Sequence, residues 1–169
     1  MSKVKKIFLD MDGVFCDFDA RWFDMFGRTP KESRNNKEFS PDWEEFITGK
    51  NFTDLPWTEG GKELFEFILS LPADIQVEML TSSGGKKFHD EVKAQKKVWL
   101  CDNGFPWKAN VVPGRGLKKQ YATPDSILID DTYDVIEAFD AAGGVAIWNK
   151  NASETIGRLK ELMNGDSTS

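Results

Sequence analysis

The chain has 169 residues, of which 40% are hydrophobic and 30% charged, so it is long enough for one domain with its own core. Its net charge of −6 argues against sequence-independent nucleic-acid binding, which depends on lysines and arginines that neutralise phosphates. Cys16 and Cys101 are too few for a disulfide framework, and no apolar stretch has the length of a membrane span or a signal-peptide core, so a cytoplasmic location is expected.

Short apolar segments alternate with amphipathic segments along the chain. The apolar segments predict strands at 4–9, 75–80, 111–112, 126–129 and 145–148, each typical of strands covered on both faces. The amphipathic segments predict helices at 59–71, 86–101, 132–142 and 153–163, the last with Ser153 as its N-cap. This alternation predicts right-handed βαβ crossovers and an α/β fold with a mostly parallel sheet.

Residues 18–56 interrupt the alternation. The segment is rich in Phe and Trp, its helical patches are short, and it contains Pro30, Pro41 and Pro56. We therefore expect a small helical cap at 18–56, inserted after the first strand into a core made of residues 1–17 and 57–169. An insertion there would lie over the carboxyl edge of the sheet, where ligands bind in α/β folds.

Two pairs of acidic residues follow predicted strands. Asp10 and Asp12 follow the first strand, and side chains two residues apart on an extended chain point the same way. Asp130 and Asp131 follow the fourth strand. Carboxylates gathered at one edge repel each other unless a cation lies between them, so these four residues predict a metal site. A surface acidic turn and acids that complement a helix dipole are the alternative interpretations.

Hydroxyl and amine groups lie at two further places. Thr81 and Ser82 follow the second strand, and their hydroxyl and backbone N–H groups could hold a phosphoryl oxygen, or cap the next helix. The pair Lys118 and Lys119 by itself indicates only a solvated face. The chain thus contains two aspartates, two hydroxyl groups, a lysine and two further aspartates, in that order. Together they could supply what hydrolysis of a phosphate ester requires: a nucleophile, a general acid, groups that hold phosphate, and a site for Mg²⁺.

On these motifs the chain resembles the haloacid dehalogenase (HAD) superfamily of phosphatases. The matching motifs are LDMDGV at 9–14, Thr81-Ser82, Lys118 or Lys119, and LIDD at 128–131. More narrowly, DMDGVFCDF at 10–18, NFTDLP at 51–56, LTSS at 80–83 and LIDD are similar to the 5′(3′)-deoxyribonucleotidases. The resemblance implies a Rossmann-like core, Mg²⁺ dependence, an aspartyl-phosphate intermediate and, in the narrower case, a 5′-nucleotidase acting on (deoxy)nucleoside monophosphates.

The resemblance also implies roles for the acidic residues. Asp10 would be the nucleophile. Asp12 would protonate the leaving alkoxide and later activate water. Mg²⁺ would be held by the Asp10 carboxylate, the Asp12 backbone carbonyl and Asp130, with Asp131 close by.

Thr81, with Ser82 and Ser83 beside it, would hold the phosphoryl group and the substrate in the same comparison. A lysine would neutralise the phosphate charge. A K-x-x-Y-A pattern favours Lys118 for this role, whereas the spacing to the later aspartates favours Lys119.

Cap aromatics would contact the base of a nucleotide. Phe18 and Phe52 match the positions that stack on the base in the deoxyribonucleotidases, and Trp43 and Phe46 lie in the same cap region. Core packing of a small cap is the alternative for each of them.

Other functions are left open by the sequence. The substrate could be another small phosphomonoester or a polynucleotide 3′-phosphate, although the acidic charge weakens the second. A phospho-accepting receiver domain would have its motifs in a different order, and a non-catalytic relative would be expected to lack Asp10 or Asp12. The expected partner is a small phosphomonoester, with no membrane. Oligomeric state and base and sugar preference stay open.

Two further residues carry minor expectations. The only histidine, His89, cannot form a zinc site and is expected on the surface. Arg115 lies in a predicted turn from which it could reach a substrate phosphate.

Overall fold

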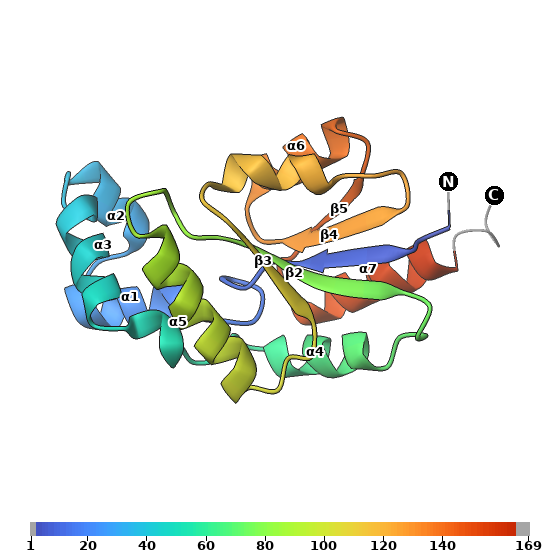
Figure 1. Ribbon diagram of the computed structural model, residues 1–169, viewed down its shortest axis with the longest axis horizontal. Coiled ribbons are helices and arrows are strands. Elements are labelled where there is room, and N and C mark those ends of the chain that lie inside the picture. Colours follow the sequence, from blue (N-terminus) through green and yellow to red (C-terminus); the bar gives the residue numbers. More distant parts are fainter. Residues whose placement is uncertain (1–2, 165–169) are drawn as a thin grey trace.

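The computed structural model describes residues 3–164, which form a five-stranded sheet that is parallel throughout (Figure 1). The strands are β1 (Lys6–Leu9), β2 (Gln76–Ser82), β3 (Lys108–Val112), β4 (Ser126–Asp130) and β5 (Val145–Trp148). Their order is β3-β2-β1-β4-β5, so the carboxyl end of β1 lies between those of β2 and β4. The predicted α/β fold with a parallel sheet is confirmed.

Helices cover both faces of the sheet. One face packs against α4 (Gly61–Leu69), α5 (His89–Asp102) and α7 (Ala152–Met163), and the other against α6 (Tyr133–Ala141) and the 3-10 helix η2 (Arg115–Tyr121). Successive residues of β1 therefore point to different cores: Ile7 and Leu9 belong to the first, and Phe8 to the second. Burial on both faces explains why the strands are short and apolar.

Local signals set the ends of these helices. The last helix is capped by Asn151, whose Oδ1 accepts from the backbone N of Glu154 at 2.8 Å. The predicted N-cap Ser153 is wrong, because Ser153 already lies inside α7. The helix predicted from residue 86 begins only at His89.

The chain between β1 and β2 contains the helices α1 (Phe18–Phe26), α2 (Pro30–Asn35), α3 (Phe39–Thr48) and η1 (Asn51–Thr53) before α4. Figure 1 shows α1, α2 and α3 grouped beyond the carboxyl ends of the strands. A capping box fixes the start of α2: Thr29 Oγ1 accepts from Glu32 N, and Glu32 Oε2 accepts from Thr29 N.

The helices α1, α2 and α3 pack around aromatic side chains that continue the hydrophobic core on the α4, α5 and α7 side of the sheet. Trp22 and Phe46 are fully buried there. The indole of Trp22 donates to Ser33 Oγ at 3.0 Å, and Ser33 Oγ donates to the buried carboxylate of Asp42. Arg28 completes this network with two hydrogen bonds to Asp42, so the polar groups inside the aromatic cluster are paired.

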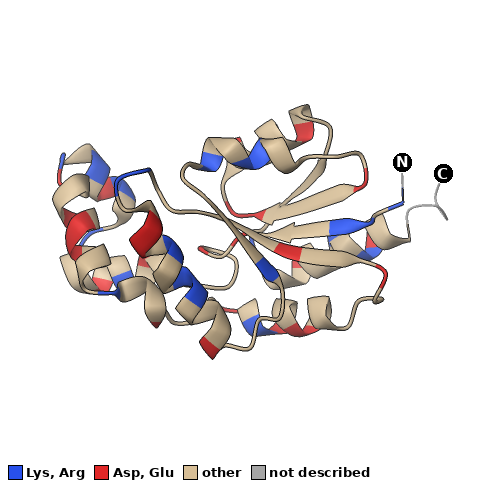
Figure 2. Ribbon diagram, in the orientation of Figure 1, with Lys and Arg blue, Asp and Glu red and all other residues tan. Residues whose placement is uncertain are grey.

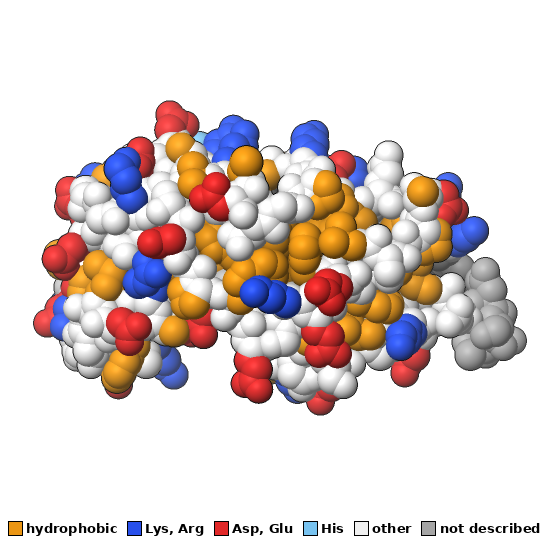
Figure 3. All heavy atoms as spheres, turned by 90° about the horizontal axis from the view of Figure 1, so that it is seen from below, with side chains coloured by type: hydrophobic (Ala, Val, Ile, Leu, Met, Phe, Trp, Pro, Cys, Tyr) orange, Lys and Arg blue, Asp and Glu red, His pale blue; other side chains and the backbone are white. Residues whose placement is uncertain are grey.

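The surface carries charges of both signs. Acidic and basic residues are interspersed along the helices (Figure 2). On the face seen in Figure 3, hydrophobic side chains also reach the surface between the charged ones. Within residues 3–164, no helix combines the length and the apolar character needed to cross a membrane.

Candidate active site

The polar residues that follow three strands meet at the carboxyl edge of the sheet. Asp10 follows β1, Thr81 and Ser82 end β2, and Asp130 ends β4. Because β1 is hydrogen-bonded to both β2 and β4, these strand ends are neighbours. They border a cavity of about 690 Å³, whose other wall includes Phe18 and residues of α2 and α3.

A tight turn after β1 gives the first acidic motif its shape. The carbonyl of Met11 accepts from the backbone N of Val14, Phe15 and Cys16 at 2.9 to 3.2 Å. Gly13 lies inside this turn with φ of +80°, and a Cβ at this position would overlap the carboxylate of Asp131. Only glycine fits both the conformation and the close approach, which explains its place after the two aspartates.

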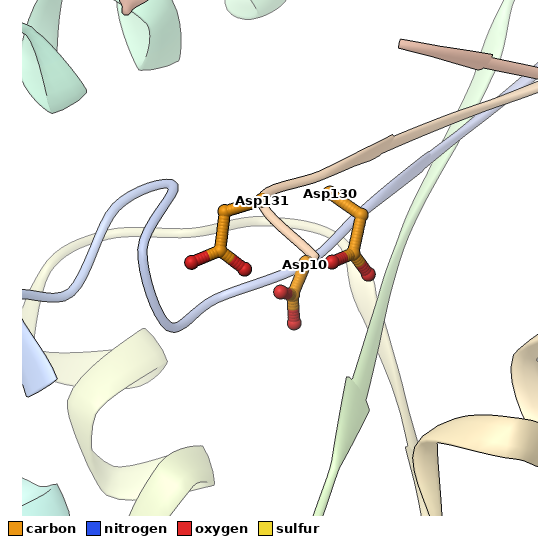
Figure 4. A group of neighbouring side chains, drawn as sticks. All are labelled: Asp10, Asp130 and Asp131. Atoms are coloured by element: carbon orange, nitrogen blue, oxygen red, sulfur yellow. The ribbon is translucent and has the colours of Figure 1, made fainter. Parts of the chain in front are cut away.

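Three carboxylates lie together at this edge of the sheet, and two of them, Asp10 and Asp131, line the cavity. One carboxylate oxygen from each of Asp10, Asp130 and Asp131 lies within 4.8 Å of the others, and Figure 4 shows the three groups side by side at the strand ends. Asp10 and Asp130 are buried, whereas Asp131 is more exposed. Asp130 Oδ1 also accepts from Thr132 N at 3.0 Å, which fixes its orientation.

Lys118 is the lysine of this group. Its Nζ lies 3.0 Å from Asp10 Oδ1 and donates to Asp130 Oδ2 at 2.7 Å, and the residue is 3% exposed. Burial alone would lower the pKa of Lys118, but the charges of Asp10 and Asp130 outweigh burial and raise it. Lys119 is exposed and does not line the cavity, so the candidacy of Lys119 is wrong.

The carboxylates repel one another in spite of Lys118. Burial and the neighbouring charge of Asp10 raise the pKa of Asp130 to about 7, against the opposing effect of Lys118. Desolvation in the cavity and the charges of Asp10 and Asp130 raise the pKa of Asp131 to about 8. A divalent cation would remove this repulsion, and an all-oxygen set of donors suits Mg²⁺. The three residues therefore fit the metal that the sequence predicts.

The side chain of Asp12 is held apart from this group. Its Oδ2 accepts from Lys96 Nζ at 3.0 Å, and its buried Oδ1 has no hydrogen-bond partner among residues 3–164. Burial raises the pKa of Asp12; Lys96 lowers it, and Asp10 raises it further. The Asp12 carboxylate is thus paired with Lys96 and lies outside the group of Asp10, Asp130 and Asp131, so Asp12 could contribute to the expected metal site through its backbone carbonyl.

Lys96 was not predicted. It lies in α5, is 1% exposed, and also donates to Thr81 Oγ1 and to the carbonyl of Ser82, both at 2.7 Å. In the sequence it is one of several lysines on a polar helix. The available signal was its spacing, because Val92, Lys96 and Trp99 share one face of the helix and both neighbours are apolar.

The base contacts expected of Phe52 and Phe46 are not supported by the structure. Phe18 and Phe52 stack directly on each other, with ring centroids 5.7 Å apart and an angle of 4°. Two contacts of about 3.5 Å to an inserted base would hold such rings about 7 Å apart. Phe52 and Phe46 are buried and do not line the cavity, whereas Phe18 and Trp43 do.

Of the other residues predicted to contact the substrate, some line the cavity and some do not. Ser82 lines the cavity, but Ser83 is buried with its hydroxyl 2.7 Å from His89 Nδ1, so the role of Ser83 in substrate binding is not supported. His89 is half-buried rather than fully exposed. Arg115 lines the cavity and is paired with Asp134 at 3.0 Å.

Comparisons with known proteins support the fold of the chain. No family model matches the sequence, and no curated protein matches it. A solved structure of a hydrolase from Streptococcus pneumoniae TIGR4 matches with a TM-score of 0.56 and 16% identity, over 94% of this chain and 100% of that one. The chain has the Rossmann-like fold of that hydrolase.

Two further solved structures match less well. A HAD-superfamily hydrolase from Ehrlichia chaffeensis has a TM-score of 0.47 and 13% identity, over 97% of this chain and 100% of that one. A HAD-superfamily hydrolase of subfamily IA, variant 1, from Geobacter sulfurreducens PCA has a TM-score of 0.46 and 18% identity, over 92% of this chain and 96% of that one.

The site contains the groups that a nucleophilic displacement on an anionic substrate requires. One wall offers a buried carboxylate, Asp10, beside a buried lysine. A second carboxylate, Asp12, with a raised pKa lies two residues away, and Thr81 offers a hydroxyl. Charged groups held in a partly enclosed cavity interact more strongly than they would in water.

Proposed function

We propose that the chain is a Mg²⁺-dependent phosphomonoesterase of the HAD superfamily, with Asp10 as its nucleophile. One observation carries this proposal: Asp10 lines the cavity and belongs both to the group of three carboxylates and to the ion pair with Lys118. A carboxylate in that position can attack the phosphorus of a substrate, because Lys118 on one side and a bound cation on the other would neutralise the negative charge of the phosphate.

In this reaction Asp10 would act as the nucleophile and Asp12 as the general acid and base. Asp10 attacks phosphorus, the bond to the leaving oxygen breaks, and that oxygen takes a proton from Asp12. Water next attacks the aspartyl-phosphate, Asp12 takes its proton, and phosphate leaves with Asp10 restored. A carboxyl group whose pKa is raised by burial suits both proton transfers.

Other groups hold the phosphoryl group during these steps. Thr81 and Ser82 line the cavity and can donate to phosphoryl oxygens, and Lys118 balances the charge on Asp10. When bound by Asp10, Asp130 and Asp131, Mg²⁺ supplies positive charge that lets an anionic substrate approach a carboxylate.

We further propose a (deoxy)nucleoside monophosphate as the substrate, with residues 18–56 as a cap over the core. The support is the cavity wall, which includes the aromatic side chains of Phe18, Phe39 and Trp43. Phe39 and Trp43 are nearly parallel, at an angle of 16°, and the Arg34 guanidinium lies 4.3 Å from the centre of the Phe39 ring. A base would stack on Trp43, because the Phe39 ring is already covered by Arg34 and Trp22.

Phosphate release tests both levels of the proposal. Purified protein is incubated with p-nitrophenyl phosphate and with a panel of ribo- and deoxynucleoside monophosphates, each with Mg²⁺ and with EDTA. We expect Mg²⁺-dependent release from both kinds of substrate and a higher kcat/KM for a nucleotide. Release that persists in EDTA would contradict the metal site, and release from p-nitrophenyl phosphate alone would contradict the nucleotide.

A further inference from the structure

We propose that Lys96 is a positioning residue that holds Asp12 and Thr81 ready for reaction without touching the substrate. This inference rests on the proposed phosphomonoesterase, because it assigns a task to a residue that acts through two members of that site. Lys96 does not line the cavity, whereas Asp12 and Thr81 do.

The contacts of Lys96 use its whole ammonium group. Its Nζ donates to Asp12 Oδ2 at 3.0 Å, Thr81 Oγ1 at 2.7 Å and the carbonyl of Ser82 at 2.7 Å. An ammonium group has three N–H donors, so each contact can take one of them. One lysine thereby joins the turn after β1 to the end of β2.

These contacts decide which atoms of the two partners stay free. Because Asp12 Oδ2 is held by Lys96, Oδ1 is the oxygen left for exchanging a proton, and it has no other partner among the residues the structure describes. Thr81 Oγ1 accepts from Lys96, so the hydroxyl proton of Thr81 can be donated to a phosphoryl oxygen. Lys96 thus orients a proton carrier and a donor together.

The surroundings of Lys96 keep it in place. The ring of Phe52, from η1, lies with its centroid 5.1 Å from Lys96 Nζ on the side of the cap. The preceding residue, Gln95, accepts from Phe52 N at 3.2 Å and donates to the carbonyl of Ile47 at 2.8 Å. These bonds fasten α5 to the cap, so Phe52 has a structural task beside Lys96 rather than a contact with substrate.

Stability alone does not account for a lysine here. Removing an ammonium group from water is costly, and an apolar residue in such a position often gives an equally stable or more stable protein. Val92 and Trp99 on the same face of α5 show that the surroundings accept apolar side chains. A buried lysine whose bonds end on two candidate site residues is therefore better explained by the reaction.

The test compares two leaving groups in the full chain. An alkyl phosphate such as glycerol 2-phosphate expels an alkoxide, which needs a proton from Asp12, whereas p-nitrophenolate leaves without one. We expect K96M to lower kcat/KM for glycerol 2-phosphate at least about 10-fold more than for p-nitrophenyl phosphate. K96R, which keeps the charge, should recover part of that difference, and K97M, on the exposed side of α5, should match the wild type.

A crystal structure of K96M gives a second readout that does not need activity. We expect the Asp12 carboxylate or the Thr81 hydroxyl to leave its wild-type position, while the fold is kept. If both groups stay in place, or if K96M lowers kcat/KM equally for the two substrates, the inference about Lys96 is overturned.

The same measurements separate this inference from the proposed function. A wild-type protein that releases no phosphate from any substrate would overturn the phosphomonoesterase, and the crystal structure would still decide whether Lys96 positions Asp12. If K96M does not fold, K96Q and K96R replace it in both measurements, because K96Q keeps an uncharged hydrogen-bond donor on a side chain one bond shorter.

Discussion

The carboxyl edge of the sheet and the helical segment beyond it are built in different ways. At the edge, charged groups such as Asp10, Asp130 and Lys118 are buried in direct contact, and burial with mutual repulsion raises the pKa of Asp130. In the helical segment, Trp22, Phe46 and Phe52 form an aromatic centre. The comparison teaches that burying the charged groups of the proposed active site costs stability, and that the aromatic packing supplies stability. The predictions below test this division.

The largest effect is expected at the edge. Asp10→Asn removes the proposed nucleophile and weakens the group of three carboxylates, so kcat should fall at least about 10³-fold. The free energy of unfolding should fall little, or rise, because a buried charge is removed from a site of repulsion. Steady-state kinetics and urea unfolding measure the two quantities.

The matched control is Asp74→Asn, which changes an exposed acid far from the cavity. It should keep wild-type kcat and stability. An Asp10→Asn protein with nearly wild-type activity would remove the nucleophile from the proposal.

The helical segment should respond in the opposite way. Phe52→Ala leaves a cavity in the aromatic centre, so the free energy of unfolding should fall by roughly 3–5 kcal/mol. Any loss of kcat/KM should be similar for a nucleotide and for p-nitrophenyl phosphate, since Phe52 does not line the cavity. Phe23→Ala, at an exposed position of α1, should have little effect. A loss confined to the nucleotide would restore Phe52 as a base contact.

A glycine at the edge tests the close approach of two segments. Gly13→Ala introduces a Cβ that displaces the Asp131 carboxylate, so the Mg²⁺ concentration for half-maximal rate should rise roughly 10- to 100-fold. Gly27→Ala is the control, because Gly27 also has positive φ, +68°, but a Cβ there meets nothing within 4 Å. Both variants should lose stability, and only Gly13→Ala should change the Mg²⁺ requirement.

Trp43 is the residue at which the cap should affect specificity. Trp43→Ala should lower kcat/KM for a nucleotide roughly 5- to 150-fold, which corresponds to a base–aromatic stack of about 1–3 kcal/mol. The loss for p-nitrophenyl phosphate should be smaller, and Trp43→Phe should recover part of the difference. An equal loss for both substrates would place Trp43 with Phe52, as part of the aromatic centre.

The sequence predicted the edge better than the segment beyond it, for a physical reason. Residues at the ends of buried parallel strands must meet at one edge, so the spacing of Asp10, Thr81 and Asp130 determined that they would be neighbours. Aromatic residues in short helices have no such constraint, because a ring can face the centre or the cavity on either side of its helix. The stacking of Phe18 on Phe52 therefore required the structure.

The positions of the lysines were partly predictable from the sequence. A K-x-x-Y-A pattern favoured Lys118, and the 3-10 geometry of η2 turns Lys118 inward and leaves Lys119 exposed. Lys96 lies in a helix whose other lysines, Lys93 and Lys97, are more exposed, and its burial depends on how α5 packs against η1. A single buried lysine on an apolar stripe is a weak signal in a sequence and a clear one in a structure.

The smallest effect is expected away from the edge, at Glu78 in β2, where an acid contributes to stability. Burial alone would raise the pKa of Glu78, but hydrogen bonds from Lys6 and Asn110 outweigh burial and lower it. A folded-state pKa below the unfolded value gives stability that is present above the unfolded pKa, near 4.3, and is lost as pH falls through the folded pKa. Glu78→Gln should therefore lower the free energy of unfolding by about 0.2–1 kcal/mol at pH 7, and this difference from the wild type should shrink toward pH 3.

Urea unfolding at both pH values measures this difference, with Glu63→Gln, at an exposed position, as a control that should show no such difference. A Glu78→Gln cost that persists undiminished at pH 3 would mean that the contribution of Glu78 is packing and not charge.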